Sequence, residues 1–331
     1  SIIIPTRNRV DLLQRCISNL ESRTHYSNYE IIIVDNNSDD KRTLTYLGSL
    51  RHKVLQFDGE FNFSKINNFA AAHAKGDHLL FLNNDTEAID EHWLEAMLEH
   101  SQRPEVGMVG TLLLYPKHKH NEATIQHAGV IVGLVGVASH AFVHLSADKS
   151  NYFGLHRLVR NCSAVTGACV MVKRKVFDEV GGFDEKFKVT YGDIDLCLRV
   201  LEKGYRNIYT PYAVMYHHEC ATRGRLDPDD DEKLMINRWK EFIIKGDPYY
   251  NSNLTLLRAD YSVASNGSEI RPLSLLIDIY NLRRDLRTNY SETSQGDYRR
   301  LVEWAVTHGP TDKASRLLRP YSTYYISHLF E

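Results

Sequence analysis

The first 85 residues alternate between short apolar runs and longer segments with helical character. The apolar runs at 2–4, 30–35 and 78–82 lack the polar alternation of a half-exposed strand, so each predicts a strand that is covered on both faces. Segment 11–20 carries apolar residues spaced three and four apart, and the alanine-rich segment 64–75 ends before a glycine, so both predict helices. Strands joined by helices are typical of a parallel sheet, and the pattern therefore predicts an α/β fold.

Further strands and helices follow this unit, although the alternation becomes less regular after residue 114. Strands are expected at 106–114 and 164–173, and helices at 90–100, 175–180, 193–203 and 227–245. The glycine- and histidine-bearing stretch 126–161 has no periodic pattern, so we assign no secondary structure to it.

Polar residues stand where the predicted strands end. Thr6 follows the first strand, Asp35 ends the second, and Asn83, Asn84 and Asp85 follow the third. Parallel strands present their carboxyl ends at the edge where α/β proteins bind ligands, so Asp85 is a candidate ligand for a hard divalent cation. The alternative is that the last three residues form only a turn, or that Asp85 caps the next helix. No Gly-x-Gly-x-x-Gly follows the first strand, which argues against a dinucleotide site.

The charge and the cysteines narrow the class of protein. The chain has 40 basic and 42 acidic residues and a formal net charge of −2, which does not favour nucleic acid or an anionic membrane as the main partner. Its five cysteines are widely spaced, which favours packed thiols in a reducing compartment over a disulfide framework. No signal peptide and no apolar run of ~20 residues is recognisable, so we expect a cytoplasmic protein. Ser1 leads directly into a strand, which indicates a domain from a longer parent chain.

Nine short motifs follow one another at 1–9, 33–38, 61–68, 82–86, 126–129, 165–168, 180–184, 191–199 and 217–219. Taken together, they resemble the inverting family 2 glycosyltransferases of the GT-A fold that build bacterial surface polysaccharides, including rhamnosyltransferase-like members. The resemblance covers roughly residues 1–250. It implies a nucleotide-diphospho-sugar transferase fold, in which a Rossmann-like, mostly parallel sheet has helices on both faces.

For the donor, the resemblance implies a site for a nucleoside-diphosphate sugar with a UDP, dTDP or GDP carrier. Asp35 takes the position of the carboxylate that reads the base, and Asn67 and Asn68 match the amide near the nucleotide. The donor-binding residues implied in this way are Pro5, Thr6, Arg7, Asp35, Asn37, Asn67, Asn68, Asn83, Asn84 and Arg223. The alternative interpretation is that Asp35 caps the next turn and that Arg7 is a solvated surface charge.

For the metal, the resemblance gives Asp85 the last position of the family's Asp-x-Asp motif, whereas Asn83 occupies the first. An amide removes one negative charge, so the cation, Mn²⁺ or Mg²⁺, is expected to depend on a further ligand. His217 matches the histidine that commonly completes the site in this fold. His218 is the second choice, and Glu219 could substitute for it.

For the reaction, the resemblance implies direct displacement at the anomeric carbon, which needs a base for the acceptor hydroxyl and no covalent nucleophile. Asp193 matches the position of that base, with Asp195 as the second candidate, and the alternative is that Asp193 only caps a helix. The residues expected at the acceptor are Thr166, Gly167, Ala168 and Gly192. In the first three, small side chains let the backbone approach a sugar, although tight packing is an alternative reason for them.

The resulting hypothesis is a transferase of hexosyl or deoxyhexosyl groups that acts on a hydroxyl of a glycan or lipid-linked saccharide in O-antigen- or capsule-like synthesis. The alternative is a catalytically inactive GT-A module that binds nucleotide or glycan, and Asn83 and Gly192 support that alternative. Residues 1–250 are expected to form the catalytic domain and 251–331 a helical C-terminal extension. This extension packs on the domain, leads into a further domain or makes peripheral contact at the inner face of the cell membrane.

Overall fold

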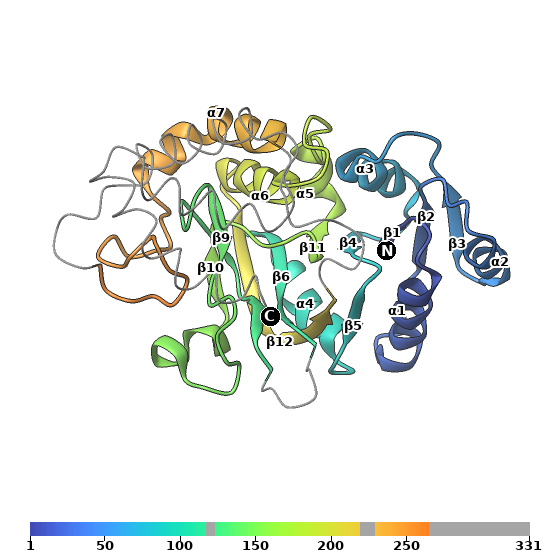
Figure 1. Cartoon of the computed structure of the whole chain (residues 1–331), viewed down its shortest axis with the longest axis horizontal. Helices are drawn as coiled ribbons and strands as arrows, with labels where there is room; N and C mark the ends of the chain where they lie inside the picture. The colour runs from blue at the N-terminus through green and yellow to red at the C-terminus, as the bar shows by residue number, and fades with distance from the viewer. Residues whose placement is uncertain (117–122, 219–228, 265–331) are drawn as a thin grey trace, which may run out of the picture. The chain divides into compact units, whose positions relative to one another are not determined.

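A computed structural model of the chain describes residues 1–116, 123–218 and 229–264 (Figure 1). Its centre is a ten-stranded sheet with the order β10-β12-β6-β11-β4-β1-β2-β3. These strands are β10 (Arg160–Cys162), β12 (Arg206–His217), β6 (Val106–Leu114), β11 (Cys169–Lys173), β4 (His78–Leu82), β1 (Ile2–Thr6), β2 (Ile31–Asp35) and β3 (Lys53–Gln56). Beside this path, β5 (Thr86–Ala88) pairs with β12, β7 (Ile125–His127) pairs with β6, and β8 (Val130–Val132) pairs with β9 (Ala138–His140) in a second sheet.

The direction of the strands decides which chain segments meet at one edge. β1 is parallel to β2 and β4, and β2 is parallel to β3, as the sequence predicts. β11 runs antiparallel between β4 and β6, and β12 is parallel to β6. The carboxyl ends of β1, β2, β4 and β12 and the amino end of β11 therefore share one edge of the sheet.

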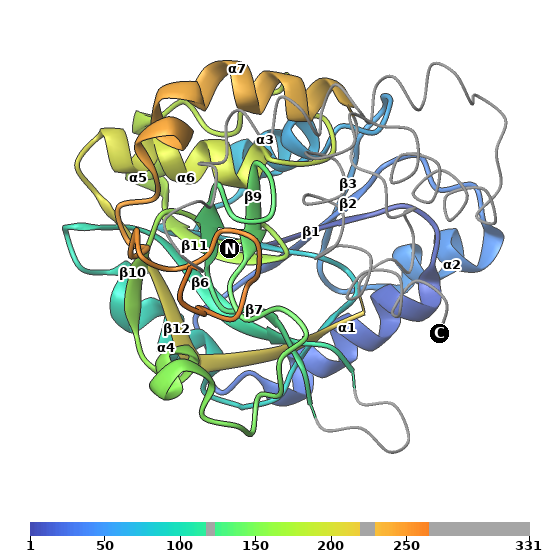
Figure 2. The same cartoon turned by 60° about the vertical axis from the view of Figure 1, so that its left-hand side comes forward.

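Helices cover both faces of the sheet (Figures 1 and 2). On one side lie α3 (Phe63–His73), α5 (Arg174–Glu179) and α6 (Gly192–Glu202), and on the other lie α1 (Val10–Arg23) and α4 (Trp93–Ser101). α2 (Lys41–Ser49) contacts α1, α7 (Asp229–Lys245) lies over α6, and a 3₁₀ helix spans Asn151–Arg157. None of the described helices is long and apolar enough to cross a membrane.

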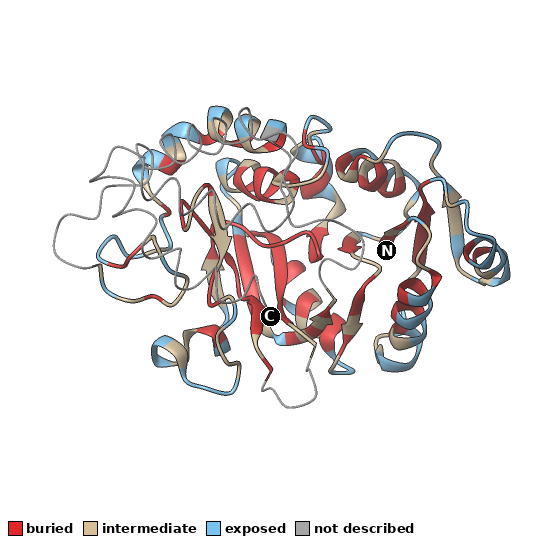
Figure 3. Ribbon diagram, viewed as in Figure 1, coloured by how far each residue is buried: buried red, intermediate tan, exposed pale blue. Residues whose placement is uncertain are grey.

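The strands are buried because the helices exclude water from both faces (Figure 3). Every residue of β2 and of the nine-residue β6 is buried. From one side, α1 inserts Leu13, Ile17 and Leu20, which are spaced four and three apart, into the core. The prediction of strands covered on both faces is confirmed.

Some elements depart from the predictions made from the apolar pattern. β12, the longest of the described strands, was not predicted because Pro211 lies in an irregularity of its pairing between Thr210 and Val214, which breaks the strand period. The strand expected at 164–173 begins only at Cys169, because the preceding residues form a loop at the edge of the sheet. α2 and β3 were also not predicted, since their burial is partial and their apolar residues are few.

Residues 251–264 pack against the segment that carries β8 and β9. The N–H of Val135 donates to the carbonyl of Leu256 and the N–H of Phe142 to the carbonyl of Ala259, both at 2.8 Å. The ring of Tyr261 stacks on Phe142 with 4.5 Å between centroids. Residues 251–264 therefore lie within the first compact unit, and the boundary at 250 stays a prediction. The described part of the predicted helical extension forms turns and an isolated β-bridge, and the rest lies outside the described residues.

The cysteines are packed as expected. Cys16, Cys162, Cys169 and Cys197 are free and buried, and Cys220 lies outside the described residues. Burial raises the pKa of Cys16, Cys162 and Cys169 to about 12. Because the thiolate is the reactive form, these thiols are inert at neutral pH.

Candidate active site

The residues predicted for the site meet at the shared edge of the sheet. β1 and β2 end side by side, with Thr6 opposite Asp35. β11 starts opposite the last residue of β4, which brings 166–168 next to 83–85. β12 ends at His217, opposite the first residue of β5. Segments that are far apart in the sequence thus deliver polar groups to one place.

The loops after β1 and β2 are joined through Asn8 and Ser38. Asn8 donates its N–H to Ser38 Oγ at 2.8 Å, and its Oδ1 accepts from the N–H groups of Asp39 and Asp40, both at 3.0 Å. Ser38 in turn donates to Asp35 Oδ1 from its N–H at 3.1 Å and its hydroxyl at 2.5 Å. The buried carboxylate of Asp35 therefore holds the turn, as the alternative interpretation expected, and is itself fixed at the sheet edge. Asn8 and Ser38 lie in two of the motifs, but the sequence did not indicate their contact.

Other predicted donor residues surround this pair of loops. Asn84 donates from Nδ2 to Thr6 Oγ1 at 3.0 Å and so ties the exit of β4 to that of β1. Arg7 is exposed beside Thr6, and Pro5 is half-buried within β1. Asn37 is exposed and has a positive φ of 56°, which asparagine tolerates better than most residues. Arg223 lies outside the described residues.

Asn67 and Asn68 lie on α3, not at the strand ends. Asn67 is fully buried and donates to the carbonyl of Phe63 at 2.8 Å, and among the described residues its Oδ1 has no donor. Asn68 uses both ends of its amide on the backbone of Phe183, donating to the carbonyl and accepting from the N–H, each at 2.9 Å. These contacts give Asn68 a structural role in the turn before residue 184, and the nucleotide contacts of both residues stay predictions.

Asn83, Asp85 and His217 form the centre of the site. Asp85 Oδ1 lies 3.1 Å from His217 Nε2, and Asn83 Nδ2 lies 3.2 Å from the same nitrogen. Asp85 is 8% exposed, and no described residue aligns a donor with its Oδ1. Burial alone would raise the pKa of Asp85, but the ring N–H and positive charge of His217 in its protonated form outweigh burial and leave that pKa below the usual value. A buried carboxylate oxygen therefore faces an imidazole nitrogen.

Gln126 decides which nitrogen of His217 carries the proton. Its Nε2 lies 3.4 Å from the carbonyl oxygen of His217, and its Oε1 lies 2.6 Å from His217 Nδ1. The carbonyl can only accept, so the amide must present its Oε1 to Nδ1, and Nδ1 must be the donor. In the neutral ring, the lone pair of Nε2 then points at Asp85 Oδ1. Oxygen and imidazole donors of this kind suit a divalent cation, and a ligand histidine usually has such a partner on its other nitrogen.

His218, the second choice for the metal, faces another way. Its Nε2 lies 2.6 Å from Glu87 Oε1, and Arg15 lies 3.6 Å from the same oxygen. Neighbouring residues of an extended chain point to opposite sides, which separates His218 from His217. Glu219 lies outside the described residues.

Asp193, the predicted base, stands at the start of α6 next to the small-residue loop. Its Oδ2 accepts from the N–H of Gly167 at 2.6 Å, and its Oδ1 accepts from the N–H of Ile194 at 2.9 Å. The residue that caps α6 is Tyr191, which has a positive φ of 59° and no side-chain cap bond. Asp193 is therefore not the N-cap residue, and its half-buried carboxylate is held at the sheet edge.

Asp195, the second candidate for the base, is enclosed in the protein. Its exposed fraction is 0%. It accepts from Arg199 Nε at 2.8 Å, Arg238 at 2.8 Å and Trp239 Nε1 at 3.0 Å. Three donors from α6 and α7 give Asp195 a structural role, and they favour Asp193 as the base.

Asp231 of α7 holds the loop that leads to Asp193. It is 2% exposed, and its carboxylate accepts from the backbone N–H of Lys188, Val189 and Thr190 at 2.8 to 3.2 Å. The sequence predicted a helix here but not this contact. Asp231 is one of several acidic residues in the run 227–232, and nothing in the sequence distinguishes it from its neighbours.

Close packing explains the small residues near Asp193. A side-chain carbon on Gly192 would lie 3.0 Å from Ser64 Oγ, and one on Gly167 would lie 3.2 Å from the Cβ of Asp193. Both glycines therefore lie in tight surroundings, and for Gly167 this agrees with the tight-packing alternative. Thr166 and Ala168 lie beside Gly167 at the sheet edge, and their contact with an acceptor stays a prediction.

His127 supports the same loop from inside the protein. Its Nδ1 donates to the carbonyl of Thr111 at 2.8 Å, so its Nε2 accepts from the N–H of Thr166 at 3.3 Å. Complete burial lowers the pKa of His127 well below the usual value, so the ring is neutral.

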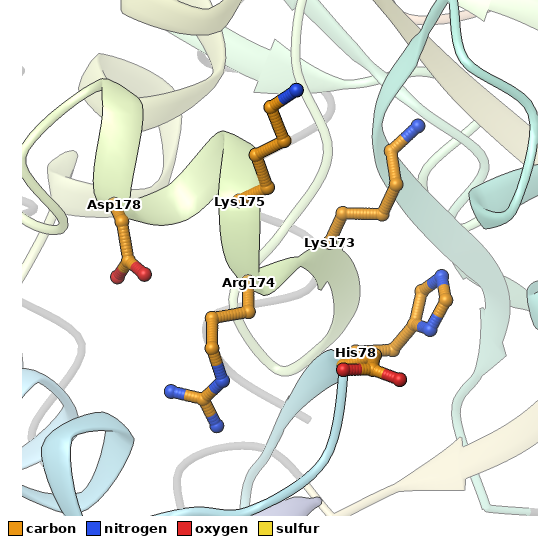
Figure 4. A pocket seen from close by; sticks show the side chains of 6 residues that line it. His78, Lys173, Arg174, Lys175 and Asp178 are labelled. Atoms are coloured by element: carbon orange, nitrogen blue, oxygen red, sulfur yellow. The ribbon is translucent and has the colours of Figure 1, made fainter.

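A hollow of about 520 Å³ lies elsewhere (Figure 4). It is lined by Asp77, His78, Lys173, Arg174, Lys175 and Asp178. β4 begins and β11 ends here, so the hollow lies at the opposite edge of the sheet and contains none of the predicted site residues.

Comparison with known proteins identifies the family. The sequence pattern of the family described as "Glycosyl transferase family 2" matches residues 1–181, more than half of the chain. The chain belongs to this family. Its fold is the GT-A fold, since it resembles the crystal structure of GalNAc-T7 with UDP, GalNAc and Mn²⁺ at a TM-score of 0.57. That match has 15% sequence identity and covers 93% of this chain and 57% of the other.

Two relatives are similar in sequence to this family 2 transferase. An uncharacterized protein, y4gI, from Sinorhizobium fredii is 41% identical over 80% of this chain and 30% of its own length. The O-antigen biosynthesis protein RfbC from Myxococcus xanthus is 40% identical over 92% of this chain and 24% of its own length. The chain thus spans less than a third of either relative.

Proposed function

We propose that this family 2 domain is a metal-dependent inverting glycosyltransferase. It moves a sugar from a nucleoside diphosphate to a hydroxyl of a glycan or lipid-linked saccharide. The observation that carries the proposal is the convergence of Asp35, the Asp85–His217 pair and Asp193 at one edge of the sheet. Each supplies a different need of the reaction: recognition of the nucleotide, a cation site and a base.

The donor is expected to lie across the exits of β1, β2 and β4. Asp35 would accept from a ring N–H of the base, and Arg7, exposed on the same edge, would face the negative phosphates. Thr6 and Asn84 offer a hydroxyl and an amide for the ribose or the sugar. These groups fit a UDP-, dTDP- or GDP-linked sugar.

Asp85 and His217 fit a divalent cation, Mn²⁺ or Mg²⁺. In support, a buried carboxylate oxygen with no aligned donor among the described residues faces the imidazole lone pair at 3.1 Å. When bound, such a cation neutralises the charge that develops on the diphosphate leaving group. Asn83 replaces a carboxylate with a neutral amide, so the charge of Asp85 carries more of the affinity.

Asp193 is the proposed base. As the acceptor oxygen forms its bond to the anomeric carbon and the bond to the phosphate oxygen breaks, Asp193 takes the hydroxyl proton. The Gly167 N–H and Ile194 N–H hold the carboxylate so that it points to the edge of the sheet. Attack on the side opposite the leaving group inverts the anomeric centre.

The proposed process is the synthesis of a cell-surface polysaccharide of the O-antigen or capsule type. The similarity to RfbC, an O-antigen biosynthesis protein, supports it. The acceptor would approach Thr166, Gly167 and Asp193.

The test is release of nucleoside diphosphate by the full chain from a panel of UDP-, dTDP- and GDP-sugars, with Mn²⁺ or with EDTA. We expect one donor class to be consumed and EDTA to stop the release. Asp85→Ala should lose Mn²⁺-dependent nucleotide binding in calorimetry while its melting temperature stays near that of the wild type. Binding of nucleotide without turnover of any donor or acceptor would instead support the inactive GT-A module. Unchanged Mn²⁺-dependent affinity in Asp85→Ala would remove that residue from the cation site.

A further inference from the structure

Two histidines and a glutamate converge on the side of the sheet covered by α1 and α4. His25 follows the end of α1, His92 precedes the first residue of α4, and Glu95 lies in the first turn of α4. Glu95 Oε1 lies 3.0 Å from His25 Nδ1 and 3.5 Å from His92 Nδ1. The three ligand atoms lie within 4.8 Å of one another. We refer to these residues as the His25–His92–Glu95 cluster.

The backbone holds the three positions in place. The N–H of His25 donates to the carbonyl of Glu91 at 2.9 Å, next to His92. The fully buried Trp93 donates from Nε1 to Thr24 Oγ1 at 3.1 Å. The loop after α1 is therefore pinned to the start of α4, and His25 does not need a large loop movement to meet the other two side chains.

The two imidazole rings and the carboxylate have the chemistry of a transition-metal site. Both Nδ1 atoms face the same carboxylate oxygen, and the ring centroids of the histidines are 4.7 Å apart at an angle of 62°. Ligands of a four-coordinate Zn²⁺ lie ~2.0–2.2 Å from the ion and hence roughly 3.3–3.5 Å from one another. The two histidine–carboxylate separations of 3.0 and 3.5 Å lie close to this range, and all three ligand atoms lie within 4.8 Å of one another. The other oxygen of Glu95 is buried and has no donor among the described residues.

A histidine–carboxylate pair elsewhere, which has no second histidine, serves as a comparison for the His25–His92–Glu95 cluster. His52 Nε2 lies 3.0 Å from Glu21 Oε1, but no second histidine joins this pair in the described residues. One pair needs only a hydrogen bond. Here two imidazole nitrogens face one carboxylate oxygen, an arrangement in which a cation can bind all three groups at once.

We propose that His25, His92 and Glu95 bind a divalent transition-metal ion of the Zn²⁺ class, with water completing the coordination. The bound ion links the loop after α1 to α4, and its stabilisation of the folded chain grows with the logarithm of the ion concentration once that concentration exceeds Kd. The site shares no residue with the Asp85–His217 pair. It therefore does not depend on the glycosyltransferase mechanism.

The test uses the full chain carrying Asp85→Ala, so that the proposed catalytic cation site does not contribute. Calorimetry with ZnCl₂ alone should detect one site per chain, and Zn²⁺ should raise the melting temperature. Co²⁺ should give the visible absorption of a four-coordinate ion. Both signals should disappear in His25→Asn and His92→Asn, which alter exposed side chains and should leave the fold intact.

His52→Asn is the matched control and should keep the binding. The proposal is overturned if the Asp85→Ala chain binds no Zn²⁺, or if binding persists unchanged in His25→Asn and His92→Asn. Equal loss of binding in His52→Asn would also overturn it, because that result means adventitious binding to surface histidines.

Discussion

His217 and His218 show how two identical neighbouring side chains acquire different chemistry. His217 meets Asp85 and Gln126 at the site, whereas His218 pairs with Glu87 on β5. The difference comes from the alternation of an extended chain and from the residues that each side chain then meets. In the sequence, the family resemblance ranked His217 before His218 as the metal ligand. In the structure, Asp85 lies next to one ring nitrogen of His217 and Gln126 next to the other.

We expect His217→Gln to abolish Mn²⁺-dependent nucleotide binding, and His218→Gln to leave it near the wild-type value. Gln126→Leu removes the acceptor that orients the His217 ring, and it should weaken Mn²⁺ affinity about 10–100-fold. Calorimetry with nucleoside diphosphate and Mn²⁺ measures all three. If His218→Gln is the variant that loses binding, the assignment of the metal ligand is wrong.

We expect Asp193→Asn to lower turnover by about 10²–10⁴-fold while donor affinity stays near wild type, because an amide cannot accept the acceptor proton. Steady-state kinetics with whichever donor the panel of nucleotide sugars identifies measures this. The amide also faces the Gly167 N–H, so a modest fall in melting temperature is expected as well.

Asp195→Asn is expected to lower stability, in contrast to Asp193→Asn, which is expected to lower turnover. It weakens the buried interactions of Asp195 with Arg199 and Arg238, and it should destabilise the fold by up to about 3–5 kcal/mol. Urea unfolding measures that loss. A stable Asp195→Asn that does not turn over, together with a fully active Asp193→Asn, would move the base to Asp195.

At the scale of elements, α7 holds the catalytic segment in place. Asp231 binds the N–H groups of 188–190, just before α6, while Arg238 and Trp239 reach Asp195 within α6. α7, which follows His217, the proposed metal ligand, in the sequence, thus supports the proposed base. The position of the loop 188–190 and the position of Asp193 therefore both depend on α7.

We expect Asp231→Ala to lower kcat roughly 100-fold with little change in the donor KM, because small misplacement of a catalytic group is costly. The neighbouring Asp230 is exposed and pairs only weakly with Lys233 at 3.7 Å, so Asp230→Ala is the matched control and should be neutral. Hydrogen exchange of 188–192 should accelerate in Asp231→Ala alone. A normal kcat in that variant would show that the loop keeps its position without α7.

At the scale of the whole molecule, the first compact unit ends later than the motifs do. Residues 251–264 carry no donor motif, yet Leu254 and Tyr261 are buried, and Tyr261 stacks on Phe142. Removing this segment would expose apolar surface on the domain.

We therefore expect a chain of residues 1–264 to bind nucleotide as tightly as the full chain. A chain of residues 1–250 should melt at a lower temperature, because it loses the stacking partner of Phe142. Calorimetry and thermal denaturation of both truncated chains test this. Loss of nucleotide affinity in the 1–264 chain, with its fold intact, would mean that the C-terminal residues form part of the donor site.

The sequence by itself determined the α/β class, the parallel strands β1, β2 and β4, and the polar residues that end them. It could do so because fully buried strands are continuous apolar runs, and because each motif is a local pattern. The end of the third strand also indicated Asp85 as a candidate, and the family resemblance indicated Asp35 and Asp193. In each case the signal lies within a few residues of the chain.

Only the tertiary structure decided which of these groups meet. β12 escaped prediction because Pro211 and its bulge interrupt the strand period, yet β12 is what carries His217 to Asp85. The contacts of Gln126 with His217, and of Asp231 with the loop before α6, join residues far apart in the sequence. Such contacts depend on the order and direction of the strands and on helix packing. No local pattern encodes them, because the same residue types form ordinary turns and caps wherever the fold does not bring them together.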